Sequence, residues 1–306
     1  MTDIRKPRRG SLAVRPRKRA RSILHKLNIF NNKRDLDGFI GYKAGMVSFS
    51  YKIKLKDGSF SEVSNGTIIE VPPLRVYGIR YYLENNKIVD IYTDNEEILK
   101  PLRLKPRKAE VIGKIKEVRT LIYSMPKETG SVEINHPIRA EIHVSEAKAK
   151  EILGKVIKFS DIYKVGELLD VASVSKGKGW QGEIKRFGVA KQRRKATGKV
   201  RHVGTLGPWH PHYVMYYVPR AGQTGYHNRV ELNKQIILIS NEKLERHLDH
   251  YGFTKSEYIL VKGSIPGPVK RPVFLRSAIR PREPEQISSV KVILWKWMFM
   301  IWKEKL

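Results

Sequence analysis

The fold is set by GFIGYKAGM (residues 38–46) and YKIKL (51–55), which are followed by Asp57-Gly58. Apolar and basic residues alternate in the second stretch, which is typical of a strand with one buried face. An Asp-Gly pair after such a strand is a strong signal for a hairpin turn. The two stretches therefore predict short strands, with a turn at 57–58, at the start of an ordered body near Asp37.

Further short strands follow along the chain. Asn65-Gly66 predicts a turn, and strands are expected at 67–71, 76–83, 88–92, 111–123, 138–144, 168–174, 236–240 and 258–261. Helices are expected to open at 94–99, to follow the capping residue Ser145 as far as 153, and to cover 241–251 before Gly252. Many short strands with few helices predict a mainly β fold, a barrel with an α/β insertion at about 72–162.

Basic residues are concentrated in three segments. Residues 1–34 hold twelve Lys/Arg and one acid, residues 176–230 hold another twelve and one acid, and residues 262–282 hold six and none. These segments carry +28 of the formal net charge of +30, so the other 196 residues are almost neutral. Cationic segments on a nearly neutral body are typical of a protein that binds a polyanion.

The first two basic segments lack a core of their own. Residues 1–36 predict a basic arm, and RPRKRAR (15–21) has no apolar periodicity, so we expect the arm to be disordered in the free chain. A β-barrel core is predicted over 37–262, and residues 176–230 are an extension within that range of the sequence. They combine nine glycines with the basic residues. We interpret them as an irregular extension that becomes ordered on an RNA, because glycine lets the backbone approach a phosphate-sugar chain.

Aromatic residues in the extension are candidates for stacking on bases, namely Trp180, Phe187, Trp209, Tyr213, Tyr216, Tyr217 and Tyr226. The predicted RNA-binding set takes two of these aromatics together with basic, His and Gln residues: Arg5, Lys6, Arg8, Arg9, Arg15, Arg17, Lys18, Arg19, Arg21, Lys176, Lys178, Trp180, Lys185, Arg186, Lys191, Gln192, Arg193, Arg194, Lys195, Lys199, Arg201, His202, Trp209, His210, Arg220, Gln223, His227, Arg229, Lys270 and Arg271.

Enzyme and cofactor signatures in the extension are weak. GKGWQG (177–182) matches the G-x-G-x-x-G fingerprint, but no long amphipathic helix follows, and Lys199 and Arg201 stand where a dinucleotide site needs an acid. His210 and His212 have no cysteine or carboxylate beside them to complete a zinc site. The extension holds one carboxylate, too few to orient a hydrolase triad. We therefore expect no catalytic residue, no metal and no cofactor.

Neither end of the sequence predicts a membrane segment. No apolar stretch of signal-peptide length follows the first basic residues. Residues 263–306 predict a basic, Pro-rich tail that ends in an apolar, Trp-rich tract at 290–302. That tract has thirteen residues and two lysines, fewer than the roughly 20 that a membrane helix needs. An amphipathic tail, a tail buried by a partner and a tail on a membrane surface all stay open, although we expect no membrane contact. The absence of cysteine fits a reducing cytosol.

Four motifs carry a resemblance to a known family: KGKGWQG (176–182), KRFGV (185–189), GPWHP (207–211) and AGQTGYHNR (221–229). They closely resemble the large-subunit ribosomal protein L3 family, with the spacing of its archaeal type. Residues 38–46 and KGSIPGP (262–268) match as well, so the resemblance spans most of residues 1–282.

The resemblance implies a β-barrel of the translation-protein type with an α/β insertion and long extensions. It also implies a structural protein of the large ribosomal subunit, not an enzyme, in the cytoplasm. Such a protein binds large-subunit rRNA early in assembly, contacts neighbouring ribosomal proteins, and reaches toward the peptidyl-transferase centre with Trp209 at the tip. A general nucleic-acid-binding or compacting protein and an RNA-modifying enzyme are the alternatives.

Overall fold

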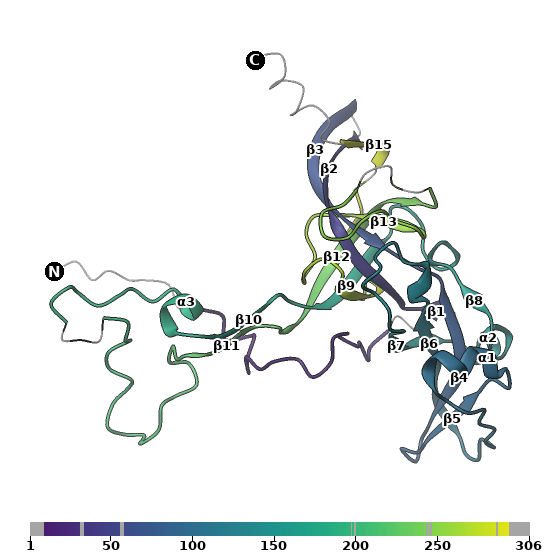
Figure 1. The fold of residues 1–306 in the computed structure, drawn as a ribbon, viewed down its shortest axis with the longest axis horizontal. Coiled ribbons are helices and arrows are strands. Elements are labelled where there is room, and N and C mark those ends of the chain that lie inside the picture. Colours follow the sequence, from purple (N-terminus) through teal and green to yellow (C-terminus); the bar gives the residue numbers. More distant parts are fainter. Residues whose placement is uncertain are drawn as a thin grey trace. The chain divides into compact units, whose positions relative to one another are not determined.

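The computed structural model of the chain describes residues 9–30, 34–55, 58–196, 198, 200–242, 244, 247–285 and 287–293. The chain divides into two compact units. Residues 23–173 and 229–306 form one, which we call the barrel unit, and residues 1–22 and 174–228 form the other, the extension unit. Figure 1 shows the strands of the barrel unit and the narrow ribbon of the extension unit.

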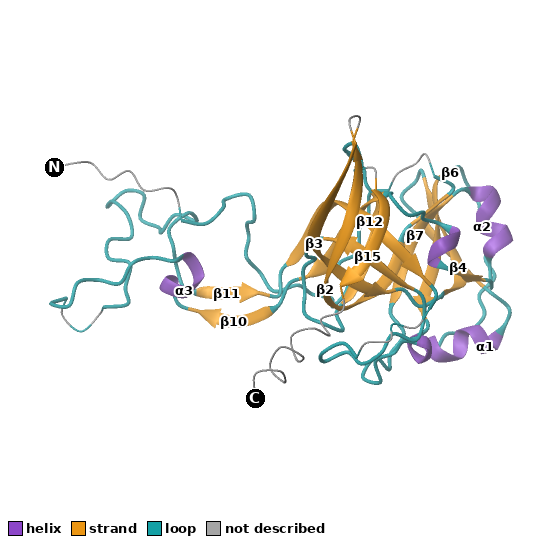
Figure 2. Ribbon diagram, turned by 90° about the horizontal axis from the view of Figure 1, so that it is seen from above, coloured by secondary structure: helices purple, strands orange, loops and turns teal. Residues whose placement is uncertain are grey.

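Six strands of the barrel unit close into a ring. Their order is β14-β9-β12-β13-β3-β2, and β2 pairs in turn with β14. A seventh strand, β15, pairs with the second half of β2. Figure 2 shows several of these strands together. Their bounds are β2 (Phe39–Leu55), β3 (Gly58–Glu70), β9 (Leu168–Val174), β12 (Asn228–Ser240), β13 (Tyr258–Lys262), β14 (Pro272–Ser277) and β15 (Ile287–Ile293).

The hairpin that opens the body is longer than predicted. The two short strands expected at 38–46 and 51–55 form one strand, β2, and Leu55 pairs with Gly58 across the expected turn. The turn expected at Asn65-Gly66 is absent, because β3 runs through it. A Cβ on Gly66 would lie 2.7 Å from Leu260 Cδ1, so the glycine allows strands to pack closely instead of turning the chain.

A second sheet stands beside the barrel within the same unit. Its strands are ordered β1-β7-β6-β4-β5, and β8 pairs with β4. Apart from β1, these elements and the short helices near them fall in the predicted insertion (Figure 2). The bounds are β1 (Leu36–Asp37), β4 (Leu74–Leu83), β5 (Ile88–Tyr92), α1 (Glu96–Leu99), η1 (Lys100–Leu102), β6 (Ile115–Ser124), η2 (Pro126–Glu128), β7 (Arg139–Val144), α2 (Glu146–Ile152), β8 (Val156–Ile157) and η3 (Phe159–Asp161).

The barrel and the second sheet share one hydrophobic core. Phe39 and Phe274 from the barrel belong to the same buried cluster as Ile122 and Ile142 from the second sheet. Phe39 also packs edge-on against Phe159, with ring centroids 5.3 Å apart. The predicted mainly β fold is confirmed, and its two sheets are held together by burial of apolar side chains.

Two details of the predicted organisation are wrong. Among the described residues of 241–251 there is no helix, but a turn with a bridge between Leu248 and Gly252. Leu244 and Leu248 are buried in a barrel cluster, and the Leu244 N–H donates to Thr254 Oγ1, so tertiary contacts replace helical ones. The tail expected from residue 263 instead contains β14, whose six residues are all buried in the barrel.

A buried carboxylate ties two loops to the end of β3. The Glu70 carboxylate accepts hydrogen bonds from the N–H groups of Gly130, Lys255 and Ser256, at 2.7 to 3.1 Å. The Tyr251 hydroxyl donates to it as well. Burial, and then the Glu70 charge, raise the pKa of Tyr251, so the hydroxyl keeps the proton that it donates.

We predict that Glu70→Ala lowers the free energy of unfolding by about 3 kcal/mol, because it leaves buried donors without an acceptor. Urea unfolding followed by far-UV circular dichroism measures the change. Glu242→Ala, at an exposed position after β12, is the matched control and should stay within about 0.5 kcal/mol of the parent chain. A similar loss in both variants would contradict the role of Glu70.

The extension unit is built on a two-stranded ribbon. Strand β10 (Gly177–Gln181) pairs antiparallel with β11 (Gly222–Gly225). Helix α3 (Glu183–Phe187) follows β10 and ends at Gly188, whose φ of +66° is accessible to glycine at little cost. Between α3 and β11 the described residues form no helix or strand (Figure 2).

Residues 9–22 of the predicted arm belong to the extension unit, whereas its described residues from 23 onward belong to the barrel unit. The Ala20 N–H donates to the Tyr226 carbonyl at 2.8 Å, and the Arg9 guanidinium donates to the Gly188 carbonyl. The sequence predicted the arm and the extension as separate segments, and a disordered arm. In the structure, residues 9–22 pack against the extension through hydrogen bonds. The bonded residues are about 180 or more positions apart in the sequence, so no local pattern reveals these contacts.

Phe187 is the packing centre of this unit. It is 7 % exposed, and no other Phe, Tyr or Trp among the described residues of the unit is buried. Three guanidinium groups lie over its ring, with Cζ at 4.4 Å for Arg17, 5.3 Å for Arg186 and 5.5 Å for Arg15. Each such contact contributes about 0.5–2 kcal/mol, so cation–π attraction takes the place of an aliphatic core.

We predict that Phe187→Ala opens the extension unit and leaves the barrel unit intact. Loss of the ring should remove up to about 3 kcal/mol of local stability. Amide hydrogen exchange at Ala20 and His227 should become faster, while exchange in β9 and β13 stays the same. Trp180→Ala, at a ring that is 76 % exposed, is the control and should change neither region. Unchanged exchange at Ala20 in the Phe187 variant would refute this packing role.

Candidate nucleic-acid interface

The described residues of the extension unit contain one carboxylate, that of Glu183. Intramolecular neutralisation of the many Lys and Arg side chains is therefore limited. These side chains have carbonyl oxygens, aromatic rings and solvent as their neighbours. An external anion with many charges is the ligand that this balance favours.

Most of the predicted RNA-binding residues of this unit are exposed. They are Lys18, Arg19, Arg21, Lys176, Lys178, Trp180, Lys185, Lys191, Gln192, Arg193, Arg194, Lys195, Arg201, His202, Trp209, His210 and Arg220. Four further predicted residues, Arg5, Lys6, Arg8 and Lys199, lie outside the described residues. The exposed residues provide cations on the arm, on the ribbon and on the loops after α3.

Arg186 binds inside the unit. Its guanidinium donates to the carbonyls of Arg220 at 2.9 Å and Gln223 at 3.2 Å, which ties α3 to the strand β11. A Cβ on Gly222 would lie 2.8 Å from its Nη1, so the glycine leaves room for the guanidinium. Burial, and then the charge of Arg15, lower the pKa of Arg186. Arg186 therefore positions the extension, although the sequence predicted it to bind RNA.

Two other predicted residues also have internal roles. The ring of His227 is buried and donates from Nδ1 to the Lys18 carbonyl at 2.8 Å. The Gln223 side chain donates to the carbonyls of Thr224 and Gly225. In this structure the ring of His227 holds the arm against the ribbon, and its contact with RNA stays a prediction.

Arg15 is incompletely satisfied. Its guanidinium lies over the rings of Phe187 and, at 6.0 Å, Tyr216. Its Nε and Nη2 atoms are buried and have no hydrogen-bond partner among the described residues. Unpaired buried N–H groups cost about 1–3 kcal/mol each, so an acceptor that reached them would stabilise the unit. Arg9 and Arg17, the other partly buried arginines of the arm, contact Gly188 and Phe187.

Large aromatic rings are exposed on the loops after α3. The exposed fraction is 80 % for Trp209, 67 % for Tyr213 and 66 % for Tyr216. Trp209 meets His212 edge to face, with centroids 5.4 Å apart. Such rings can stack on unpaired bases. Of the predicted stacking residues, Phe187 is buried and Tyr226 is covered by Arg19 at 5.0 Å.

Three predicted residues lie in the barrel unit. Lys270 pairs through Nζ with the Glu133 carboxylate at 2.7 Å. The carbonyl of Arg271 accepts from Lys43, and that of Arg229 contacts the ring of His25. These three residues belong to a different unit from most of the predicted cations. Lys270 also has a carboxylate partner already.

The remaining motifs take ordinary structural forms. GKGWQG (177–182) forms β10 and the residue before the five-residue α3, so no dinucleotide-binding helix follows it. Groups of three or more metal-ligating side chains do not occur among the residues that the structure describes. Within the described ranges, no helix is long and apolar enough to cross a bilayer. The apolar tract begins in β15, and residues 294–306 lie outside the described residues.

Comparison with known proteins identifies the family. The family model described as ribosomal protein L3 matches residues 1–97 and 111–294. The large ribosomal subunit protein uL3 of Methanothrix thermoacetophila is 39 % identical over 92 % of this chain and 93 % of its own. The uL3 proteins of Methanocaldococcus jannaschii (38 %, over 92 % and 94 %) and Methanobrevibacter smithii (37 %, over 97 % and 98 %) are similar too.

These matches confirm the archaeal-type resemblance noted in the motifs. The proteins that match are ribosomal proteins, which also confirms the expectation that the chain is not an enzyme. The chain belongs to the ribosomal protein L3 family.

Proposed function

We propose that this chain is a structural constituent of the large ribosomal subunit in the cytoplasm. It binds large-subunit rRNA early in assembly through the extension unit, and reaches toward the peptidyl-transferase centre with Trp209 near the tip. Support comes from relatives named large ribosomal subunit protein uL3, which match over more than nine-tenths of the chain.

The observation that carries the proposal is the composition of the extension unit's surface. Exposed Lys and Arg side chains stand among exposed rings such as Trp180 and Trp209, and one described carboxylate accompanies them. Phosphates neutralise the cations, and unpaired bases stack on the rings. A folded RNA supplies both groups at once, whereas a duplex supplies mainly phosphates.

The small core of the unit explains why binding and ordering are linked. One buried phenylalanine holds the arm and the extension together. Fixing a backbone residue costs about 1–2 kcal/mol, so the 189–221 segment needs many further contacts to be held. Phosphates around the arginines supply these contacts. The phosphate oxygens are also acceptors of the kind that the buried N–H groups of Arg15 lack.

We predict that binding to large-subunit rRNA weakens steeply as the salt concentration rises. The triple variant Arg193→Gln/Arg194→Gln/Lys195→Gln should make the slope of log binding constant against log salt concentration shallower by about 2, because each lost phosphate contact removes roughly 0.7–0.9 from the slope. Filter binding across a salt series measures the slope. The matched control Lys150→Gln/Lys155→Gln/Lys164→Gln removes the same charge from exposed positions of the barrel unit and should change the slope less. Equal slopes for the two triple variants would contradict binding through the extension unit.

Competition with duplex DNA at the same salt separates the alternatives. Structured rRNA should displace the DNA, because the exposed rings gain stacking partners only on RNA loops. Equal affinity for both would favour a general compacting protein.

We predict that Trp209→Ala impairs translation more than it impairs folding. The ring is 80 % exposed and contacts His210 and His212 at its edges, so its loss should change the free energy of unfolding by less than about 0.5 kcal/mol. Large subunits reconstituted with the variant should form peptide bonds more slowly than those with Trp180→Ala. A clear fall in the melting temperature of the free variant would show that Trp209 is part of a core.

A further inference from the structure

A fourth basic segment lies in the barrel unit, besides the three that the sequence predicted. Residues 100–108, KPLRLKPRK, hold five Lys/Arg and no acid. They begin at the end of α1, in the connection between β5 and β6. The ribosomal protein L3 model matches on both sides of this connection and leaves residues 98–110 out. Membership of the family therefore does not account for these cations.

Apolar residues anchor the segment to the second sheet. Leu99 is fully buried and belongs to a small cluster with Tyr77 of β4 and Tyr123 of β6. Leu102 and Leu104 pack against the same cluster. The leucines thus attach the segment to the sheet, and the basic residues alternate with them in the sequence.

Backbone hydrogen bonds fix the path of the segment. The Leu104 N–H donates to the Leu99 carbonyl at 3.3 Å, and the Tyr92 N–H of β5 donates to the Arg107 carbonyl at 2.9 Å. Arg103 lies between these bonds with a φ of +54°, in the left-handed conformation that ends η1. A segment that is already held in place loses less conformational entropy when it binds a ligand.

Most of the cations in this segment lack a carboxylate partner. Lys108 is the exception, since its Nζ lies 3.0 Å from the Asp94 carboxylate. The other four are exposed and form no ion pair with any described residue: Lys100, Arg103, Lys105 and Arg107.

The other acids near the segment do not neutralise it. Glu96 and Glu97 lie in the first turn of α1, where a negative charge favours the helix N-terminus. Neither forms an ion pair with a described cation, and neither does the exposed Glu110. Acids and cations are therefore separated along α1 and η1, and the cations after α1 keep their charge available.

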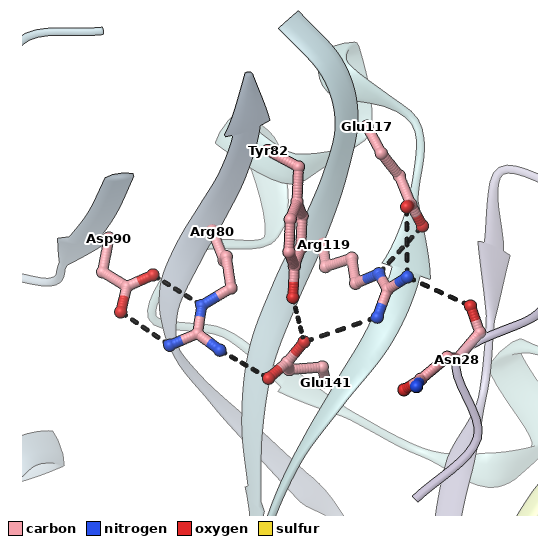
Figure 3. Close-up of polar contacts among 7 residues, drawn as sticks. All are labelled: Asn28, Arg80, Tyr82, Asp90, Glu117, Arg119 and Glu141. Carbon is pink, nitrogen blue, oxygen red and sulfur yellow. Dashed lines mark hydrogen bonds and ion pairs between the residues drawn. The ribbon is translucent and has the colours of Figure 1, made fainter. Parts of the chain in front are cut away.

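Arginines elsewhere on the second sheet are already paired. Arg80 binds the carboxylates of Asp90 and Glu141 at 2.6 and 2.5 Å, and Arg119 binds that of Glu117 at 2.8 Å (Figure 3). The unpaired cations of residues 100–107 thus differ from those of the strands. An external anion with several charges is the partner that they lack.

The anion that fits this segment is a run of phosphates on paired RNA. Residues 98–110 contain no aromatic side chain, so they offer no ring on which an unpaired base could stack. Arg103 and Arg107 have planar guanidinium groups, which bind phosphate oxygens through two N–H groups at once. Double-helical RNA is recognised in this way, by its phosphates and its shape, because its bases are paired.

We propose that residues 100–107 bind the phosphate backbone of a double-helical segment of large-subunit rRNA, as a contact separate from that of the extension unit. The rings of the extension unit take unpaired bases, whereas this segment binds paired RNA by charge. The inference rests on the proposed function, because it needs the rRNA of the large subunit.

Directed cleavage of rRNA tests the partner. The chain has no cysteine, so Glu110→Cys gives one attachment point for an iron chelate that releases hydroxyl radicals, and it keeps all five cations. In large subunits assembled with the labelled full-length chain, we expect cleavage on both strands of an rRNA helix, read by primer extension. Cleavage confined to unpaired rRNA, or no rRNA cleavage because a protein covers the segment, would overturn the inference.

A second label separates this inference from the proposed function. Ala190→Cys, at an exposed position after α3 in the extension unit, should direct cleavage of rRNA in the same kind of particle. Cleavage from position 190 without cleavage of a helix from position 110 would defeat the contact at residues 100–107 alone. Failure of the chain to enter large subunits would overturn both.

Charge removal tests the cations themselves. Arg103→Gln/Lys105→Gln/Arg107→Gln should make the slope of log binding constant against log salt concentration shallower by about 2, at roughly 0.7–0.9 for each lost phosphate contact. In the chain labelled at position 110 it should also reduce cleavage of the helix at least tenfold. Lys150→Gln/Lys155→Gln/Lys164→Gln removes the same charge from exposed positions of the same unit and should change both readouts less. Equal effects of the two triple variants would contradict binding by residues 100–107.

Discussion

The shortage of carboxylates in the extension unit is the constraint on which the rest depends. With Glu183 as the one described acid, the arginines have few ways to be satisfied inside the unit. Arg186 takes backbone carbonyls, Arg17 takes a ring face, and Arg15 keeps two buried N–H groups without acceptors. Because like charges remain close together, an external anion would stabilise the unit.

The barrel unit, by comparison, has carboxylates beside its buried donors. Its buried acids have their donors nearby: Asp37 accepts from Tyr163 and Ser277, and Asp170 pairs with Arg276 at 3.2 Å. A continuous apolar core joins its two sheets. The extension leaves β9 and returns into β12, which are neighbours in the barrel, so both ends of the extension join paired strands.

Much of this organisation could be predicted from the sequence. The β class and the position of the insertion followed from short alternating strands and turn dipeptides, and charge counts located the extension. The errors arose where long-range contacts overrule local pattern. PVFLRS (272–277) was counted with its basic flanks and is a buried barrel strand. Phe187 was expected to stack on bases, but its neighbour Arg186 and the distant Arg15 and Arg17 cover its ring.

Arginine itself shows how the two units meet different partners. In the second sheet, Arg80 on β4 binds Asp90 on β5 and Glu141 on β7, and Arg119 on β6 binds Glu117 of the same strand (Figure 3). Both arginines are therefore already paired with carboxylates. In the extension unit the same side chain, at Arg15, is left without such a group. The local supply of acids, more than the number of arginines, therefore decides which surface can face RNA.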